Sequence, residues 1–355
     1  MRILTKYIVK TVITYTFLVV LLLLGLHAFL EFMHEFSDLG SGNYGLLQVM
    51  QYVPMMLPGD IYQFFPMAGL LGTIIGLGLL ASTSELVAMR SAGLSMWNVS
   101  FSVLQAAIIL IVIMIILGEI ISPFAQRFAI EKKSIAISGG QTLVTKHGIW
   151  QRNGDNYVHI NKIASNGSLE GVTRYYFAAK NKLALASYAK SAVFVNKQWI
   201  FKNVTQTTFL PNSTTSAYLP QQEWGFKINP KLLGLTSVDT DQKTLPELRS
   251  YIKYRYQSGL GSHFYEFIFW QRLFQPLATL VMIILAVPFV FGPFRSASMG
   301  LRMLAGVMVG FGFYILNQFA GPMSTVLQFS PAIAAILPTL VFVCIGGVLC
   351  VKLSR

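Results

Sequence analysis

Three ionisable side chains share one face of the first long apolar segment. His27, Glu31 and His34 stand at spacings of i, i+4 and i+7, which places them on one side of a helix. Ionisable groups inside a membrane are costly and usually face a cavity or a partner helix. This face therefore lines a wet or headgroup-facing surface, or its outer members reach the membrane interface. A zinc site is a third interpretation, but no fixed ligand set accompanies the two histidines.

A second candidate group lies in Ser84–Gly93, between the second and third apolar segments. Ser84 followed by Glu85 is typical of a helix start, and the closing glycine is typical of a helix end. The sequence therefore predicts a short helix at about residues 84–93. The residues that recur there at helical spacing are Leu86, Met89 and Arg90. Such a surface would suit a partner protein, and an ordinary interfacial turn is the equally simple alternative.

The sequence shows no residue spacing typical of catalysis. Ile137–Gln141 reads Ile-Ser-Gly-Gly-Gln, like the signature loop of ABC-type ATPases, but no G-x-x-x-x-G-K-[ST] phosphate loop exists anywhere in the chain. Cys344 and Cys350 are six residues apart on one predicted helix, about 9 Å along its axis, and should stay free thiols. We therefore expect a non-catalytic chain; if ATP powers its action, another polypeptide binds the ATP.

Long apolar segments must position these groups. The chain of 355 residues is 54% hydrophobic and 12% charged, whereas soluble domains carry about 25% charged residues. A spanning helix needs about 20 apolar residues. The segments that qualify are Val12 to Met33, Ile61 to Ala81, Val99 to Ile121, Phe264 to Phe291, Met299 to Ala320, and Ala332 to Val351. The sequence thus predicts six transmembrane helices.

Positive residues in the short connections indicate the orientation of these helices. The basic residues on one side are Arg2, Lys6, Lys10, Arg90, Arg295, Arg302, Lys352 and Arg355. The alternate connections, Phe36 to Asp60 and Gly321 to Pro331, contain no Lys or Arg. We expect both termini to be cytoplasmic and the long connection to lie outside.

That long connection should be a folded β domain. Short runs rich in β-branched and aromatic residues alternate with turn residues, which is typical of strands; the runs are Tyr157 to Ile163, Val172 to Ala178, Ala192 to Val195, and Trp199 to Val204. Leu245 to Tyr256 should be a short helix. The predicted organisation is 1–130 with three spans, 131–262 as an inserted all-β, jelly-roll-like domain, and 263–355 with three spans. The domain has 17 Lys and Arg against seven Asp and Glu, a net charge of +10 that would attract an anionic amphiphile or membrane surface.

Three stretches of the chain resemble a known family. They are Gln63–Gly72 (Gln-Phe-Phe-Pro-Met-Ala-Gly-Leu-Leu-Gly), Ser84–Gly93, and Phe291–Ser296 (Phe-Gly-Pro-Phe-Arg-Ser) with Met299–Arg302. With the six-span layout and the inserted domain, they resemble the LptF/LptG family of lipopolysaccharide export permeases over essentially the whole chain. The Phe-Phe-Pro-Met and Phe-Gly-Pro-Phe-Arg stretches resemble the LptG branch more than the LptF branch.

The resemblance implies a permease subunit in the inner membrane of a Gram-negative cell. Such a subunit extracts lipopolysaccharide from the outer leaflet through openings bordered by the first and fifth spans, and passes it to a periplasmic bridge toward the outer membrane. The implied partners are the paralogous permease LptF, a dimer of the ATPase LptB, the single-span protein LptC and, indirectly, the bridge protein LptA. ATP and Mg²⁺ are then bound by LptB, and this chain carries no cofactor or metal.

The resemblance also implies roles for individual side chains. The ATPase-coupling residues are Glu85 with its neighbours Leu86, Met89 and Arg90. The substrate-cavity residues are Phe64, Phe65, Met67, His27, Glu31 and Arg302. One departure concerns the outer end of the first span, where basic residues are expected to meet lipid phosphates but Glu31, Glu35 and Asp38 stand instead. Lipid phosphates and these acids carry like charges, so headgroup contact at this position would need a divalent cation that bridges them.

Two other classes of function remain open from the residues alone. A secondary transporter or channel usually shows repeats or broken helices around a midplane ion site, and neither is visible in the sequence. A membrane-anchored scaffold whose outer domain does the work would tolerate changes on the cytoplasmic side. Charge reversal at Glu85 therefore separates the scaffold from the permease.

Overall fold

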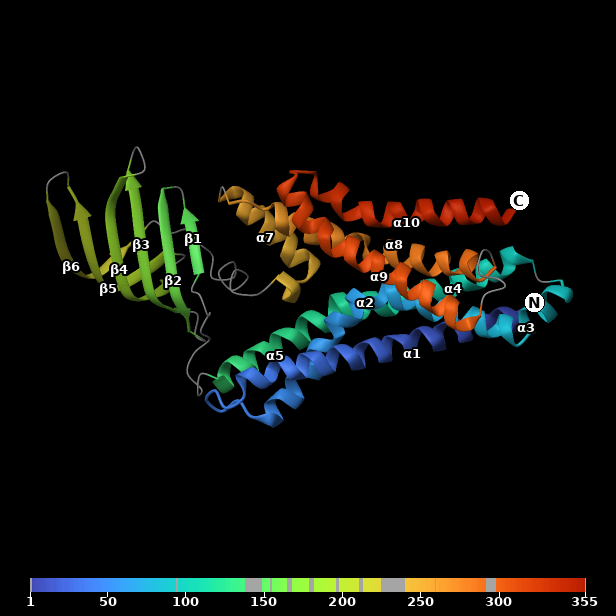
Figure 1. The fold of residues 1–355 in the computed structure, drawn as a ribbon. Helices are drawn as coiled ribbons and strands as arrows, with labels where there is room; N and C mark the ends of the chain where they lie inside the picture. Colours follow the sequence, from blue (N-terminus) through green and yellow to red (C-terminus); the bar gives the residue numbers. More distant parts are fainter. Residues whose placement is uncertain are drawn as a thin grey trace. The chain divides into compact units, whose positions relative to one another are not determined.

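The computed structural model describes most of the chain (Figure 1). The described residues are 2–93, 95–137, 149–153, 155–164, 168–178, 182–195, 198–210, 213–224, 240–258, 260–291 and 298–354. They form two compact units, each described here by itself. The membrane unit is made of Met1–His34, Val53–Ala125 and His263–Arg355, and the outer unit of Glu35–Tyr52 and Gln126–Ser262.

Long apolar helices make up the membrane unit. They are α1 (Arg2–Glu35), α2 (Leu46–Ser82), α4 (Met96–Ile115), α8 (His263–Phe291), α9 (Met299–Val326) and α10 (Pro331–Ser354). A π-helical segment, η2 (Ile116–Ile121), joins α4 to α5 (Ser122–Ile137) without a break. In the described part of the chain, six helical segments are long and apolar enough to cross a membrane, which confirms the six predicted spans.

Glycines bring the helices of this unit close together. A Cβ atom on Gly72 of α2 would overlap the backbone of Thr16 in α1. On α9, a Cβ on Gly306 would lie 2.8 Å from Ile74, and one on Gly310 would lie 2.8 Å from Met67, both on α2. These glycines therefore serve close helix packing, as the small-xxx-small spacing predicts. Figure 1 shows α8 beside α9 and α10, and α8 also packs against α4.

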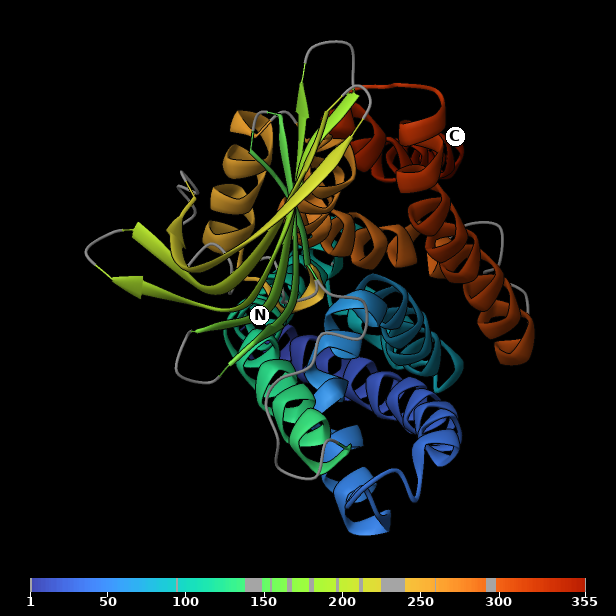
Figure 2. The ribbon, with the colours of Figure 1, turned by 90° about the vertical axis from the view of Figure 1, so that its left-hand side faces the viewer.

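The outer unit contains one antiparallel sheet. Its strands are β1 (Ile149–Asn153), β2 (Asn156–Ile163), β3 (Leu169–Ala178), β4 (Lys182–Val195), β5 (Gln198–Phe209) and β6 (Thr214–Glu223). Each strand pairs with the next one in the chain, so the order is β1-β2-β3-β4-β5-β6. The inserted β domain is thus confirmed. Its described strands are connected as a meander, without the crossovers of a jelly roll (Figure 2).

The sheet bends along a line that crosses its strands. Buried residues on one strand normally alternate, yet Leu169 and Val172 are three apart and both fully buried. Gly171 between them has φ +65°, and Asn203 on β5 has φ +54°, so the backbone turns there and both sides present their apolar residues to the same face. Two cross-strand rows result: Ile160, Val172, Ala189, Val204 and Leu219, and Leu169, Ala192 and Phe201.

The outer unit also contains helical segments, among them η1 (Phe36–Asp38), the start of α2, most of α5, and α7. The helix α7 (Leu245–Gln257), preceded by the short 3-10 helix η4 (Thr240–Gln242), confirms the helix predicted at Leu245 to Tyr256. It begins with a capping box, in which Thr244 and Glu247 satisfy each other's backbone and side-chain groups. The guanidinium of Arg127, on α5, donates to the Glu247 carboxylate and to the carbonyl of Gln242. Charged hydrogen bonds therefore join α5 to the start of α7.

Candidate functional site

The short helix α3 (Glu85–Ser91) confirms the helix predicted between the second and third spans. Leu86 and Met89 are only 3% and 7% exposed and belong to the apolar core of the membrane unit, together with Ile8 of α1. The expectation that they form a surface for a partner is therefore corrected, because they anchor α3 to the bundle. Val87, which is 64% exposed, lies on the surface that α3 offers instead. The side chain of Arg90 lies outside the described part of the structure.

The carboxylate of Glu85 is held by two hydroxyl groups. The Tyr7 hydroxyl, on α1, donates to Oε2 over 2.9 Å, and Oγ1 of Thr83 donates to Oε1 over 3.0 Å. Ser84 has φ +64°, a left-handed conformation rather than the extended backbone of a helix N-cap, so the predicted cap is corrected as well. Tyr7 ties the first residue of α3 to the first spanning helix.

Polar and aromatic contacts join α1, α2 and α9 around His27, in the second half of α1. His27 Nε2, on α1, lies 3.3 Å from Oδ1 of Asp60 on α2. The His27 ring also meets the edge of Phe64, with centroids 5.4 Å apart, and Phe64 packs against Tyr314 of α9 at 5.9 Å. The structure therefore brings together two of the expected cavity residues and adds Asp60 and Tyr314 to them.

The remaining expected cavity residues lie in different surroundings. Phe65 is 3% exposed within the apolar core, and Arg302, near the start of α9, is 8% exposed. Met67 contacts the α9 backbone at Gly310, and Glu31 is half-buried. Among the described residues, no group of three or more His, Cys, Asp and Glu side chains is close enough together to hold a metal ion, so the zinc interpretation of His27 gains no support.

A second polar contact surrounds the π-helical segment. Tyr62 on α2 donates its hydroxyl to the carbonyl of Arg272 over 2.8 Å, and Gln275 Nε2 donates to the Tyr62 carbonyl over 3.1 Å. The Tyr62 ring fills the space where a Cβ on Gly118 would stand. Glu119, the next residue, therefore places an acid inside the bundle at a π-helical turn, a feature frequent at functional sites.

The acids at the outer end of α1 are paired with a lysine from α5. Lys133 Nζ lies 2.7 Å from both Glu35 carboxylate oxygens and 2.9 Å from Oδ2 of Asp38. The Tyr44 hydroxyl donates to Glu35 over 2.6 Å, and Lys133 also lies over the Tyr52 ring at 4.9 Å. Burial and the bond to Glu35 raise the pKa of the Tyr44 phenol, which keeps it a donor. Lys133 thus compensates the charges of Glu35 and Asp38 within the protein.

The family described as "Lipopolysaccharide export system permease LptF/LptG" matches residues 6–352. The chain belongs to the LptF/LptG family. "Lipopolysaccharide export system permease protein LptG" of Escherichia coli K12 is 34% identical over 343 residues, or 96% of this chain and 95% of that protein. The Haemophilus influenzae protein of the same name is 32% identical over 342 residues, 96% of each chain.

Several candidate residues of this LptF/LptG chain could not be found from local patterns. Tyr7 and Glu85 are 78 positions apart, and Glu35 and Lys133 are 98 apart, so only the folded chain shows their contacts. Asp60 does have a local signal, because it is an acid directly before the apolar segment Ile61 to Ala81. Most of the Phe-Gly-Pro-Phe-Arg stretch and most of the Ile-Ser-Gly-Gly-Gln stretch lie outside the described residues.

Proposed function

We propose that this chain is the permease subunit of an ATP-driven exporter of lipopolysaccharide. The observation that carries the proposal is the match of one family of export permeases to residues 6–352, which takes in all six spans and the β domain. The chain lies in the inner membrane of a Gram-negative cell, with both termini cytoplasmic and the β domain periplasmic. It takes lipopolysaccharide from the outer leaflet and passes it to a periplasmic bridge.

The proposal includes specific partners. The paralogous permease LptF completes the transmembrane pathway, LptC adds one span, and LptA receives the substrate beyond the membrane. A dimer of LptB binds ATP and Mg²⁺ beneath the membrane, because no phosphate-binding loop occurs in this chain. The chain itself is then non-catalytic and binds no cofactor.

Coupling to the ATPase is assigned to α3. Glu85 and the exposed Val87 meet LptB, while the buried Leu86 and Met89 transmit the movement of α3 to the bundle. Arg90 is kept as a proposed coupling residue on the sequence alone. Leu86 and Met89 pack into the same core as Ile8 of α1. Because protein interiors are close-packed and resist deformation, this packing supports the proposal that movement of α3 is passed on to α1.

The first test is purification of the complex with Glu85→Lys. We expect the variant to lose bound ATPase or vanadate-sensitive ATP hydrolysis, because the reversed charge faces the partner. Glu131→Lys, an exposed acid on α5, is the matched control and should leave both unchanged. Normal recovery of an active complex from Glu85→Lys would favour an anchored scaffold over a permease.

The substrate path is tested by photo-crosslinking at neighbouring positions. Phe64 takes part in the contact between His27 and Tyr314, and we propose that it lines the acyl-chain cavity with Met67. Glu31 belongs to the wet or headgroup-facing side of α1, and Arg302 offers a positive charge to the substrate. A crosslinker at Phe64 should capture lipopolysaccharide in membranes. Phe65 points into the core and should yield less product. Equal capture at both positions would show that the core opens during transport, and capture at neither would remove the assignment.

A further inference from the structure

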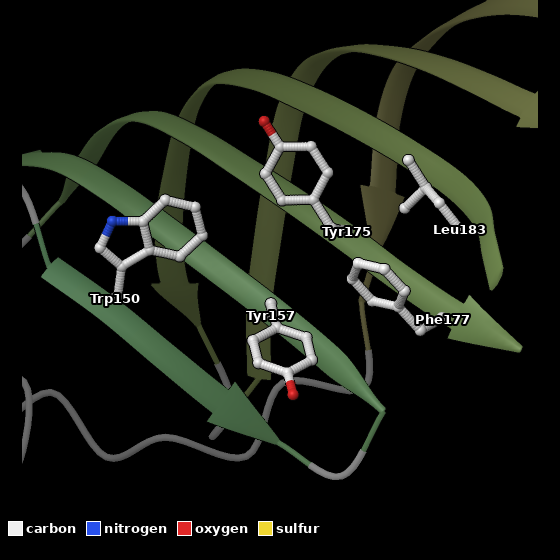
Figure 3. A pocket seen from close by; sticks show the side chains of 5 residues that line it. All are labelled: Trp150, Tyr157, Tyr175, Phe177 and Leu183. Carbon is white, nitrogen blue, oxygen red and sulfur yellow. The ribbon is translucent and has the colours of Figure 1, made fainter. Parts of the chain in front are cut away.

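An aromatic platform lies on one face of the first strands of the sheet. Its members are Trp150 on β1, Tyr157 on β2, Tyr175 and Phe177 on β3, and Leu183 on β4. They border a cavity of about 500 Å³ (Figure 3). Tyr157 precedes the buried Val158, and Tyr175 is three residues from the buried Val172. Because side chains alternate along a strand, the platform lies on the face opposite the apolar core of the sheet.

Two rings of the platform are nearly parallel, and the other two meet edge to face. Trp150 and Tyr175 are tilted by only 17° with centroids 6.2 Å apart, and Figure 3 shows both rings lying side by side with their faces in view. Phe177 and Tyr157 meet edge to face at 5.4 Å, which closes the other end. Trp150 is 57% exposed although it is the largest ring on the edge strand. Exposed aromatic clusters of this kind mark binding surfaces.

The shape and chemistry of the platform indicate one class of ligand. An acyl chain needs a cavity that encloses most of its surface, whereas this cavity is open to solvent beside Trp150, which is 57% exposed. A pyranose ring has an apolar C–H face suited to the negative face of an aromatic ring, and a rim of hydroxyl groups that stays in water. Figure 3 shows the hydroxyls of Tyr157 and Tyr175 directed away from the cluster, where they can meet such a rim. The net charge of +10 on residues 131–262 favours an anionic saccharide.

We propose that this platform binds the saccharide part of the exported glycolipid, with Trp150 and Tyr175 stacking on a sugar ring. The proposal rests on the proposed function and adds a second contact to it, separate from the acyl-chain contacts among the spanning helices. The platform would hold the polar part of the substrate on the face of the sheet opposite its apolar core. It would therefore act on long saccharides more than on truncated ones.

The first experiment measures binding directly. The full chain in lipid nanodiscs is titrated with the lipid-free oligosaccharide released from lipopolysaccharide by mild acid, and binding is followed by saturation-transfer NMR. We expect Trp150→Ala and Tyr175→Ala each to weaken binding about fivefold or more, the order expected for one stacking contact. Tyr188→Ala is the matched control, because Tyr188 is 50% exposed and pairs with Thr173 on the same face, outside the platform.

The second experiment separates this proposal from the proposed function. ATP-dependent release of lipopolysaccharide is compared for a full-length and a truncated saccharide in the reconstituted complex. Trp150→Ala should slow release of the full-length form and leave the truncated form unchanged. Binding by Trp150→Ala equal to that of the wild type, an equal loss in Tyr188→Ala, or displacement of the sugar by laurate would overturn the platform while the permease stands. Absence of any ATP-dependent release by the wild type would instead overturn the proposed function.

Discussion

At the scale of single residues, Glu85 is fixed before any partner binds. Tyr7 from α1 and Thr83 from its own turn each hold one carboxylate oxygen, so the acid points in a defined direction. Pre-positioning of this kind lowers the entropy lost when a partner contacts the side chain. The hydroxyl of Tyr7 also makes the first spanning helix a direct neighbour of the proposed coupling residue.

Removal of that hydroxyl should weaken coupling without preventing assembly. We expect Tyr7→Phe to lower lipopolysaccharide release per ATP hydrolysed by about two- to fivefold, the range for one exposed hydrogen bond to a charged group, with the amount of bound ATPase unchanged. Tyr15→Phe, two turns further along α1, is the control. In a Glu85→Ala background, which has no side-chain acceptor at that position, the Tyr7 change should add nothing. A further loss there would mean that Tyr7 acts through another group.

Glu247 gives the outer unit a defined dependence on pH. Burial raises the pKa of its carboxyl, but the hydrogen bonds from Arg127 and Thr244 outweigh burial, and the net pKa is lowered. The stability that Glu247 contributes is therefore complete above its unfolded pKa of about 4.3 and is lost as the pH falls through the lower folded value. Melting of wild type and Glu247→Gln should differ at pH 6 and converge below about pH 4. A constant difference across this range would exclude the carboxylate as its source.

At the scale of elements, three segments meet at Lys133. The end of α1 supplies Glu35 and Asp38, the connection to α2 supplies Tyr44, and α5 supplies the lysine. Glu35 is only 2% exposed, so its charge depends on Lys133 for compensation. A buried carboxylate without a partner is strongly destabilising.

Loss of Lys133 should therefore destabilise the outer unit. We expect Lys133→Met to cost about 3–5 kcal/mol, seen as a lower melting temperature in nanodiscs. Lys132→Met removes an exposed neighbouring charge and should have little effect. The double variant with Glu35→Gln should recover much of the loss, because no buried charge is then left alone. Equal melting of Lys133→Met and wild type would show that water compensates Glu35.

Local patterns predicted the elements better than their contacts. Spans of about 20 apolar residues were visible because one chemical type repeats along them. Parts of β2 to β5 were visible as runs of β-branched and aromatic residues, but only the last four residues of β4, Ala192 to Val195, were predicted. β6 was missed, since most of its residues are polar and exposed, and β1 has only five residues. The role of Leu86 and Met89 was misjudged for a physical reason: a helical apolar stripe fits a partner and a core equally well. The pairs at Glu85 and Glu35 depend on distant segments and leave no local signal.

At the scale of the whole molecule, the outer unit includes more than the inserted segment. Glu35–Tyr52, which the sequence-based division placed with the spanning helices, belongs with Gln126–Ser262. The boundary between the two units thus falls within the continuous helices α1, α2 and α5. If each of the six candidate spans crosses the membrane, the number of crossings is even and both termini lie on the same side.

Labelling with a membrane-impermeant maleimide tests that orientation. In a background with Cys344→Ser and Cys350→Ser, Thr215→Cys on β6 should label in spheroplasts. Ser91→Cys on α3 should label only after the membrane is disrupted, because positive residues retain that side in the cytoplasm. Both positions are exposed in the structure. The reverse pattern would invert the topology and separate α3 from a cytoplasmic ATPase.

The bend in the sheet restricts how sequences of this family can vary in length. The three-residue spacing at Gly171 and at Asn203 is what brings both apolar rows to one face. One residue inserted or deleted at that line would move the side chains on one side of it, in the changed strand, to the opposite face of the sheet. The same change at a hairpin end would leave the strand register as it is. Natural insertions in this domain should therefore cluster at the strand ends. Between the two apolar rows, each strand should keep the same number of residues.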